Sequence, residues 1–134
     1  LAKLERFDWE LARRRALADR YARLIRASGA PVQPLALRPG RGCAWAQYTV
    51  LVDERGRVQQ ALQAAGIPTA VHYPKPLHHQ PAFAPGHDPR AHPHSIAAAQ
   101  RVLSLPMSAD LGDDEQERVV AALAAAVAAA RSAA

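Results

Sequence analysis

The chain has 134 residues and a mass of 14.4 kDa, enough for one domain with its own hydrophobic core but too little for two. Hydrophobic residues make up 49% and charged residues 22%, which excludes a disordered, collagenous or membrane-spanning chain. The net charge of +5 would suit an anionic partner such as nucleic acid. However, only Lys3 and Lys75 are lysines, and an Ala- and Arg-rich composition can equally reflect genomic base composition.

Residues 1–28 predict one long helix. Apolar residues recur at spacings of three, four and seven, which is typical of a single buried helix face, and Gly29 and Pro31 end the pattern. Acidic residues interrupt the arginines on the opposite face, so we interpret that face as solvated rather than nucleic-acid-binding. The apolar face comprises Leu4, Phe7, Leu11, Ala18, Tyr21 and Ile25, and the basic face Arg13, Arg14, Arg15, Arg20, Arg23 and Arg26.

The middle of the chain predicts two strands, a helix and a long loop. Residues 43–52 alternate in polarity as a strand does, and residues 54–65 follow a helical pattern with Asp53 as its expected cap. Residues 67–73 predict a second strand. The proline density between residues 74 and 94 excludes a helix or an interior strand, and predicts a loop.

The last third predicts a helix at residues 95–102, a strand at 103–106 and a helix at 113–130. Asp113 and Gln116 have the spacing of a capping box at the start of the last helix. Its apolar run is mostly alanine and shorter than the roughly 20 residues that cross a bilayer, which favours a packed helix. Three or four short strands covered by helices indicate a single α+β (two-layer α/β) domain with a small mixed sheet.

All six histidines lie between residues 72 and 94. Clustered imidazoles are metal ligands, and a loop stiffened by proline could bring three of them to Zn²⁺. The spacing matches neither HExxH nor a Cys/His pattern, so we favour a polar loop with exposed histidines. A non-enzymatic module, either a basic one that binds nucleic acid or a metal-binding one built on this loop, is kept as the alternative. The single Cys43 excludes an internal disulfide and a zinc site built on several thiolates, which indicates a cytoplasmic protein.

The segment GIPTAVHYPKPLHHQPAF at residues 66–83 holds the candidate binding residues. His72 and Tyr73 come at the end of a predicted strand, where a rigid backbone runs into a loop, and such a place suits contact with a substrate. The imidazole can donate or accept a hydrogen bond, and tyrosine adds a hydroxyl to an apolar ring. From the residues alone, a packed and hydrogen-bonded structural pair is the more common outcome.

The same segment, with VLSLPMSADLGDDEQERVV at residues 102–120, resembles the C-terminal part of the DegT/DnrJ/EryC1/StrS sugar aminotransferases. These are pyridoxal-phosphate enzymes of the aspartate aminotransferase fold. AKLERFDWELARRRALADRYARLI resembles the helix that leads into their small domain, and AQYTVLVDERGRVQQALQAAGI the strand and helix that follow. The resemblance implies that residues 1–134 are the small C-terminal domain of such an enzyme, with 1–28 as a linking helix and 74–94 as a His/Pro-rich loop.

The resemblance also implies a function. PTAVHYPKPLH is most similar to enzymes that act on nucleotide-linked keto-sugars in O-antigen and related polysaccharide synthesis. The resemblance places His72 and Tyr73 on the substrate side of the active site and makes His78 a further candidate for the same pocket. It implies a homodimer that transfers an amino group, expected to come from glutamate, by way of pyridoxal phosphate, with no nucleic-acid or membrane partner.

The resemblance puts the cofactor-binding lysine and the acidic residue that pairs with the pyridine nitrogen in a large N-terminal domain, outside this sequence. Lys3 falls on the polar face of the first predicted helix, and Lys75 lies between two prolines in a loop without a glycine-rich phosphate-binding turn. Neither suits a covalent bond to the cofactor. We therefore expect no catalytic, cofactor-binding or metal-binding residue on this chain, and no activity from the fragment alone.

Overall fold

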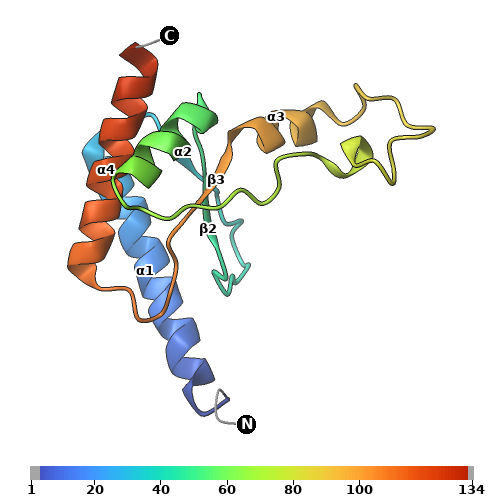
Figure 1. The fold of residues 1–134 in the computed structure, drawn as a ribbon. Helices are drawn as coiled ribbons and strands as arrows, with labels where there is room; N and C mark the ends of the chain where they lie inside the picture. The colour runs from blue at the N-terminus through green and yellow to red at the C-terminus, as the bar shows by residue number, and fades with distance from the viewer. Residues whose placement is uncertain (1–3, 133–134) are drawn as a thin grey trace.

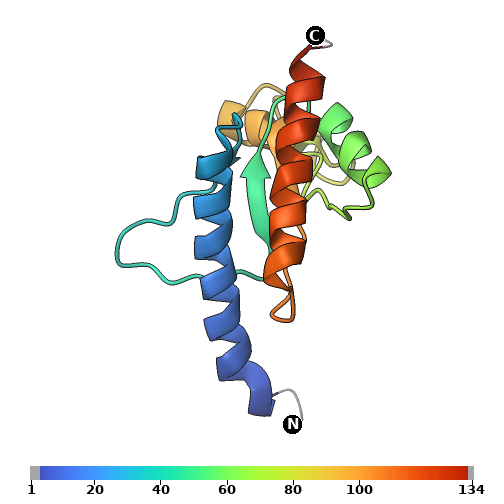
Figure 2. The same cartoon turned by 90° about the vertical axis from the view of Figure 1, so that its left-hand side faces the viewer.

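Helix α1 (Phe7–Ser28) follows a single 3-10 turn at Leu4–Arg6 in the computed structural model, which describes residues 4–132 (Figure 1). As predicted, it ends at Gly29. Glycine adopts the φ of 66° found there readily because it has no Cβ, and the Gly29 N–H donates to the Arg26 carbonyl. The buried face is shorter than predicted, because the N-terminal end of α1 extends past the sheet (Figures 1 and 2). Leu4 and Phe7 are therefore exposed.

Three short strands form one sheet in the order β1–β2–β3. The α+β class and the strand near residues 103–106 are confirmed, but the expected mixed sheet is wrong, because both pairings are antiparallel. The segment after β2 brings the chain back to the end of β2, where Val102 pairs with Leu51, and β3 then runs the other way. The strands are β1 (Gln33–Pro34), β2 (Tyr48–Leu51) and β3 (Val102–Leu105).

Two strand predictions fail for local backbone reasons. The strand expected at residues 43–52 begins only at Tyr48, because Trp45 has a φ of 50° and breaks the extended run. The strand expected at residues 67–73 is reduced to one antiparallel bridge between Ala70 and Ser104. Proline at position 68 has no N–H for a ladder, and the chain leaves the sheet after the bridge.

Three further helices complete the fold, and two of their predicted N-terminal caps are wrong. Asp53 does not cap the next helix, since its carboxylate binds the Arg101 side chain at 2.9 Å. At the last helix the capping contact comes from Glu115 rather than Gln116, with the Gly112 N–H donating to the Glu115 carboxylate at 2.8 Å. The helices are α2 (Arg55–Ala64), α3 (Pro93–Arg101) and α4 (Asp113–Ser132), and a short 3-10 turn, η2 (Leu77–His79), lies in the loop.

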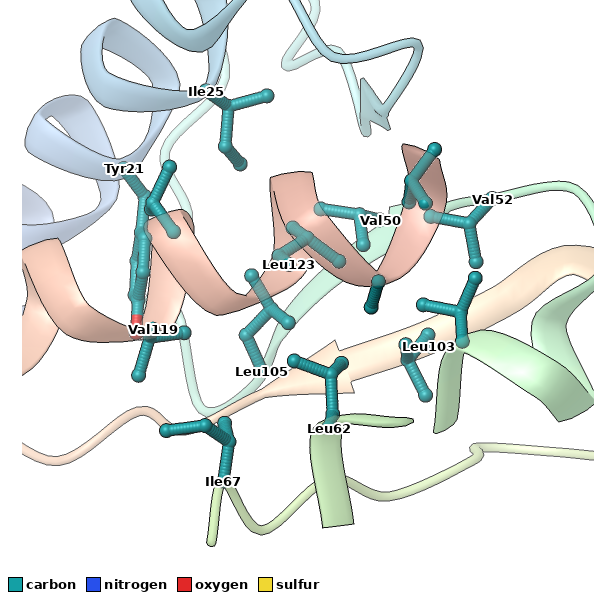
Figure 3. Close-up of a cluster of buried hydrophobic side chains, with 14 of the residues drawn as sticks. Tyr21, Ile25, Val50, Val52, Leu62, Ile67, Leu103, Leu105, Val119 and Leu123 are labelled. Atoms are coloured by element: carbon teal, nitrogen blue, oxygen red, sulfur yellow. The ribbon is translucent and has the colours of Figure 1, made fainter. Parts of the chain in front are cut away.

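The hydrophobic core lies between the sheet and the helices α1 and α4, which run side by side across one face of the sheet (Figure 2). Side chains from both helices, the sheet and α2 meet there (Figure 3). Tyr21 stacks on Tyr48 with ring centroids 4.8 Å apart, and its hydroxyl donates to the Pro106 carbonyl at 2.9 Å. Because side chains alternate along a strand, Thr49 and Ser104 lie on the opposite face of the sheet from Tyr48.

Half of the basic face of α1 is occupied by contacts within the protein. Arg14 donates to the carbonyls of Trp45 and Met107, and Arg20 to the Asp113 carbonyl and to a carboxylate oxygen of Glu117. Arg13 binds the Leu111 carbonyl and the Asp113 carboxylate. Arg13 and Arg20 therefore hold α1 to the start of α4, and Arg14 holds it to the segments that flank β2 and β3. The interpretation as a solvated face is therefore wrong for these three arginines, and holds for Arg15, Arg23 and Arg26, which are exposed.

No helix within residues 4–132 offers an apolar stretch that could cross a membrane.

Candidate functional site

A cleft of about 560 Å³ opens between the loop that follows residue 72 and helix α3. In Figure 1 the loop and α3 extend together to one side of the sheet. All three residues proposed from the sequence line this cleft, and α3 contributes a wall of small side chains. The lining includes His72, Tyr73, Lys75, His78, Phe83, His92, Ser95 and Ala99. The cleft combines hydrogen-bonding groups with apolar surface, which is typical of a small-molecule site.

His72 is anchored to the sheet, whereas Tyr73 reaches into solvent. The Nδ1 atom of His72 lies 3.3 Å from the Ser104 hydroxyl, and the imidazole is half-buried. Tyr73 is 70% exposed, with its ring edge-on to the His72 ring at a centroid distance of 5.7 Å. The packed structural pair that the residues alone favour is therefore wrong for Tyr73, although His72 is hydrogen-bonded. It is free to contact a ligand in the cleft.

His78 lies in η2 and is buried, with only 8% of its surface exposed. Within residues 4–132 its Nε2 atom has no hydrogen-bond partner. The rings of His79 and His92 lie 4.3 Å and 5.3 Å from the His78 ring, centroid to centroid. Desolvation and the proximity of these imidazoles lower the pKa of His78, because both effects disfavour a charged ring. His78 is therefore a neutral hydrogen-bonding group at neutral pH.

The lowered pKa of His78 predicts that the fold loses stability in mild acid. The unfolded chain binds a proton near the ordinary histidine pKa while the folded state does not, so the free energy of unfolding falls as the pH drops from about 7 to about 5. In His78→Asn this fall should be smaller. Thermal unfolding across that pH range measures it, with His94→Asn, an exposed histidine, as the control. Equal slopes for wild type and His78→Asn would contradict this account.

The histidine cluster does not form a metal centre in the part of the chain that the structure describes. No group of three or more His, Cys, Asp or Glu side chains is placed there to hold an ion. The rings of His79 and His92 instead lie against the ring of His78, which is buried, so the expectation of exposed histidines is wrong for His78. His79 Nε2 lies 2.6 Å from the Pro89 carbonyl. Cys43 is half-buried beside Trp45, whose N–H donates to its sulfur at 3.4 Å.

The cleft does not fit pyridoxal phosphate on its own. Transamination through this cofactor needs a lysine for the covalent bond and an acidic residue at the pyridine nitrogen. The lining contains one lysine, Lys75, and no aspartate or glutamate. Lys75 lies in the loop between Pro74 and Pro76, and Lys3 lies outside the described residues. These residues can contact a substrate, but they do not make a cofactor site.

Sequence reasoning missed the groups that approach the cleft from distant segments. Ser104 lies 32 residues from His72 in the sequence and meets it only because β3 pairs with Ala70. The sequence predicts a helix near α3, but nothing in its pattern indicates that the small side chains Ser95, Ala98 and Ala99 line a cleft. An exact strand register would have been needed to find Ser104, and the alternating pattern alone does not fix register between distant segments.

The sequence and fold of the chain are similar to those of known proteins. Residues 1–124 match the DegT/DnrJ/EryC1/StrS aminotransferase family. The UDP-2-acetamido-2-deoxy-3-oxo-D-glucuronate aminotransferase of Pseudomonas aeruginosa is 41% identical over 124 residues, which are 92% of this chain and 33% of that protein. The chain thus spans about one third of the length of the curated relatives it matches.

Solved structures agree in fold over the same region. DesV of S. venezuelae, solved in complex with a ketimine intermediate, superposes with a TM-score of 0.85 at 32% identity, over 92% of this chain and 33% of that one. The aminotransferase TlmJ of Streptoalloteichus hindustanus gives 0.82 at 29% identity, over 96% and 34%. The chain belongs to the DegT/DnrJ/EryC1/StrS aminotransferase family.

Proposed function

We propose that this chain is the small C-terminal domain of a pyridoxal-phosphate-dependent aminotransferase that aminates a nucleotide-linked keto-sugar. The observation that carries the proposal is the cleft at His72, Tyr73 and His78, which offers hydrogen-bonding groups to a ligand but no lysine and acid pair for the cofactor. The chain also spans only a third of its aminotransferase relatives. Residues outside these 134 would hold the cofactor and supply the amino-transfer chemistry.

Each cleft residue has a part in this proposal. His72, held against the sheet, and Tyr73, exposed beside it, orient the sugar by hydrogen bonds from an imidazole nitrogen and a phenolic hydroxyl. His78 presents an unpartnered Nε2 atom that can bond a hydroxyl, carbonyl or phosphate oxygen of the ligand. The apolar side of the cleft, which includes Phe83 and Ala99, keeps water from that side of the bound sugar.

The relatives' names support a nucleotide-sugar substrate. The Pseudomonas aeruginosa relative is named for a UDP-linked 3-oxo-glucuronate, and a relative 34% identical from Streptomyces venezuelae is a dTDP-3-amino-3,4,6-trideoxy-alpha-D-glucose transaminase. We extend the proposal to a keto-sugar used in O-antigen or related polysaccharide synthesis, with glutamate as the amino donor, in the cytoplasm.

The exposed apolar residues of α1 support a homodimer in which this helix is covered. Leu4, in the 3-10 turn before α1, and Phe7 and Trp9, in the first turn of α1, are about half exposed or more. The N-terminal end of the helix extends past the sheet (Figure 1). Apolar surface gathered in this way is typical of an interface. We propose that the large domain and the second subunit cover it in the intact enzyme.

The proposal is tested by comparing the 134-residue chain with the intact protein encoded by its gene. The intact protein, incubated with glutamate, pyridoxal phosphate and a UDP-linked 3-keto or 4-keto sugar, should form equal amounts of amino-sugar and 2-oxoglutarate. The 134-residue chain under the same conditions should form neither product. Turnover by the 134-residue chain alone, or an intact protein that does not transaminate any such sugar, would contradict the proposal.

A further inference from the structure

Thr49, Ser104 and His72 form a hydrogen-bonded row on the face of the sheet opposite the core. Thr49 and Ser104 are direct partners in the β2–β3 ladder, and their hydroxyl oxygens lie 2.9 Å apart. The Ser104 hydroxyl is also 3.3 Å from Nδ1 of His72. Ala70 pairs with Ser104 from the other side, which brings His72, two residues on, within reach of the Ser104 hydroxyl. The row therefore links the sheet to the edge of the cleft.

Ser104 has a fixed position in this row. It is 5% exposed, its N–H donates to the Ala70 carbonyl at 2.8 Å, and its own carbonyl accepts from the Ala70 N–H at 3.1 Å. On its other side it pairs with Thr49 in the antiparallel ladder. Its backbone is therefore held by both neighbouring segments, and its hydroxyl lies within hydrogen-bond distance of both Thr49 and His72. Ser104 and His72 also both line a second hollow, of about 290 Å³.

The single hydroxyl hydrogen of Ser104 couples the row to the protonation of the imidazole. If Ser104 donates to His72, Nδ1 carries no hydrogen, and the neutral ring holds its proton on Nε2. If Ser104 donates to Thr49 instead, His72 must donate from Nδ1. In either case Nδ1 is committed to the sheet, and Nε2 is the nitrogen left to meet a ligand.

We propose that Ser104 is a positioning residue, which holds Nδ1 of His72 against the sheet and so presents Nε2, in one protonation form, to the substrate. This inference rests on the proposed function, because it assigns to His72 a contact with the keto-sugar. Thr49 supports the arrangement by occupying the remaining hydrogen-bonding capacity of Ser104. Ser104 itself does not touch the substrate in this proposal.

A double-mutant cycle in the intact enzyme tests the role. Loss of one hydrogen bond in Ser104→Ala should lower kcat/KM about 3- to 10-fold. In a His72→Ala background the same substitution should have no further effect, since its effect passes through the imidazole. Ser104→Thr, which keeps the hydroxyl on a residue that suits a strand, should restore most of the activity. Ser132→Ala, distant on α4, is the matched control.

Imidazole nitrogen NMR spectra give a readout that a purely structural role would not move. In the wild type His72 should show a single tautomer. In Thr49→Val the form protonated on Nε2 is expected, because Ser104 then has only the imidazole to donate to. Ser104→Ala should give a mixture of tautomers. A mixture already present in the wild type would overturn the proposal even if Ser104→Ala failed to fold.

The two proposals fail in different ways. If His72→Ala lowers kcat/KM while Ser104→Ala does not, or if Ser104→Ala has the same effect in both backgrounds, the positioning role is wrong and the proposed function stands. If the intact protein transaminates no keto-sugar nucleotide, the proposed function is wrong, and the positioning role fails with it.

Discussion

Replacing His72 by alanine in the intact protein is expected to lower kcat/KM for the keto-sugar nucleotide by about 10- to 100-fold. The imidazole lines the cleft and is anchored through Nδ1 to Ser104, so its loss removes a directed hydrogen bond to the ligand. Cofactor binding should not change, because the cofactor residues lie outside this chain in our proposal. Steady-state kinetics and the visible absorbance of the bound cofactor measure the two effects separately.

The control for this substitution is His94→Ala. His94 is exposed on the first turn of α3 and is not among the residues that line the cleft. Its replacement should leave kcat/KM within about twofold of the wild-type value, as for surface substitutions in general. A His72→Ala enzyme with wild-type kcat/KM would remove His72 from the substrate site. A variant that instead lost its bound cofactor would place His72 at the cofactor.

Leu123→Ala is expected to have the largest effect on stability, a loss of about 3–5 kcal/mol in the free energy of unfolding. Leu123 is 1% exposed on α4 and lies in the core cluster between the helices and the sheet (Figure 3). Its truncation removes apolar contacts and leaves a cavity at the centre of that cluster. Since domains of this size have about 5–15 kcal/mol in total, a large part of the stability would be lost.

Urea denaturation followed by circular dichroism measures this loss. Leu37→Ala is the matched control, because Leu37 is 48% exposed in the loop between β1 and β2. The control should change the free energy of unfolding by less than about 1 kcal/mol. Equal losses from the two substitutions would contradict the assignment of the core to the interface between α1, α4 and the sheet.

The sequence predicted most accurately those features that depend on neighbouring residues. The sequence predicts the end of α1 at Gly29, because glycine readily adopts the positive φ that ends a helix, and Gly29 has a φ of 66°. His72, Tyr73 and His78 all line the same cleft because they lie within one short segment that turns around it. β2 begins later than the alternating pattern predicts, because that pattern does not reveal the positive φ of Trp45.

Features that depend on distant pairing were not predictable in the same way. Residues 67–73 predict a strand, but only Ala70 pairs with the sheet, through a single bridge to Ser104. The helical pattern of α1 includes Leu4 and Phe7, yet both are exposed. Such a pattern indicates that a face is apolar and not what covers it. The contact of Ser104 with His72 likewise required the observed register of β3.

The most direct test of our central claim is to locate the lysine that holds the cofactor in the intact protein. Borohydride reduction fixes pyridoxal phosphate to its lysine, and peptide mapping by mass spectrometry then identifies the modified residue. We predict that the modified lysine lies outside these 134 residues and that Lys75→Ala leaves the modification unchanged. A pyridoxyl group on Lys75 or Lys3 would contradict the claim.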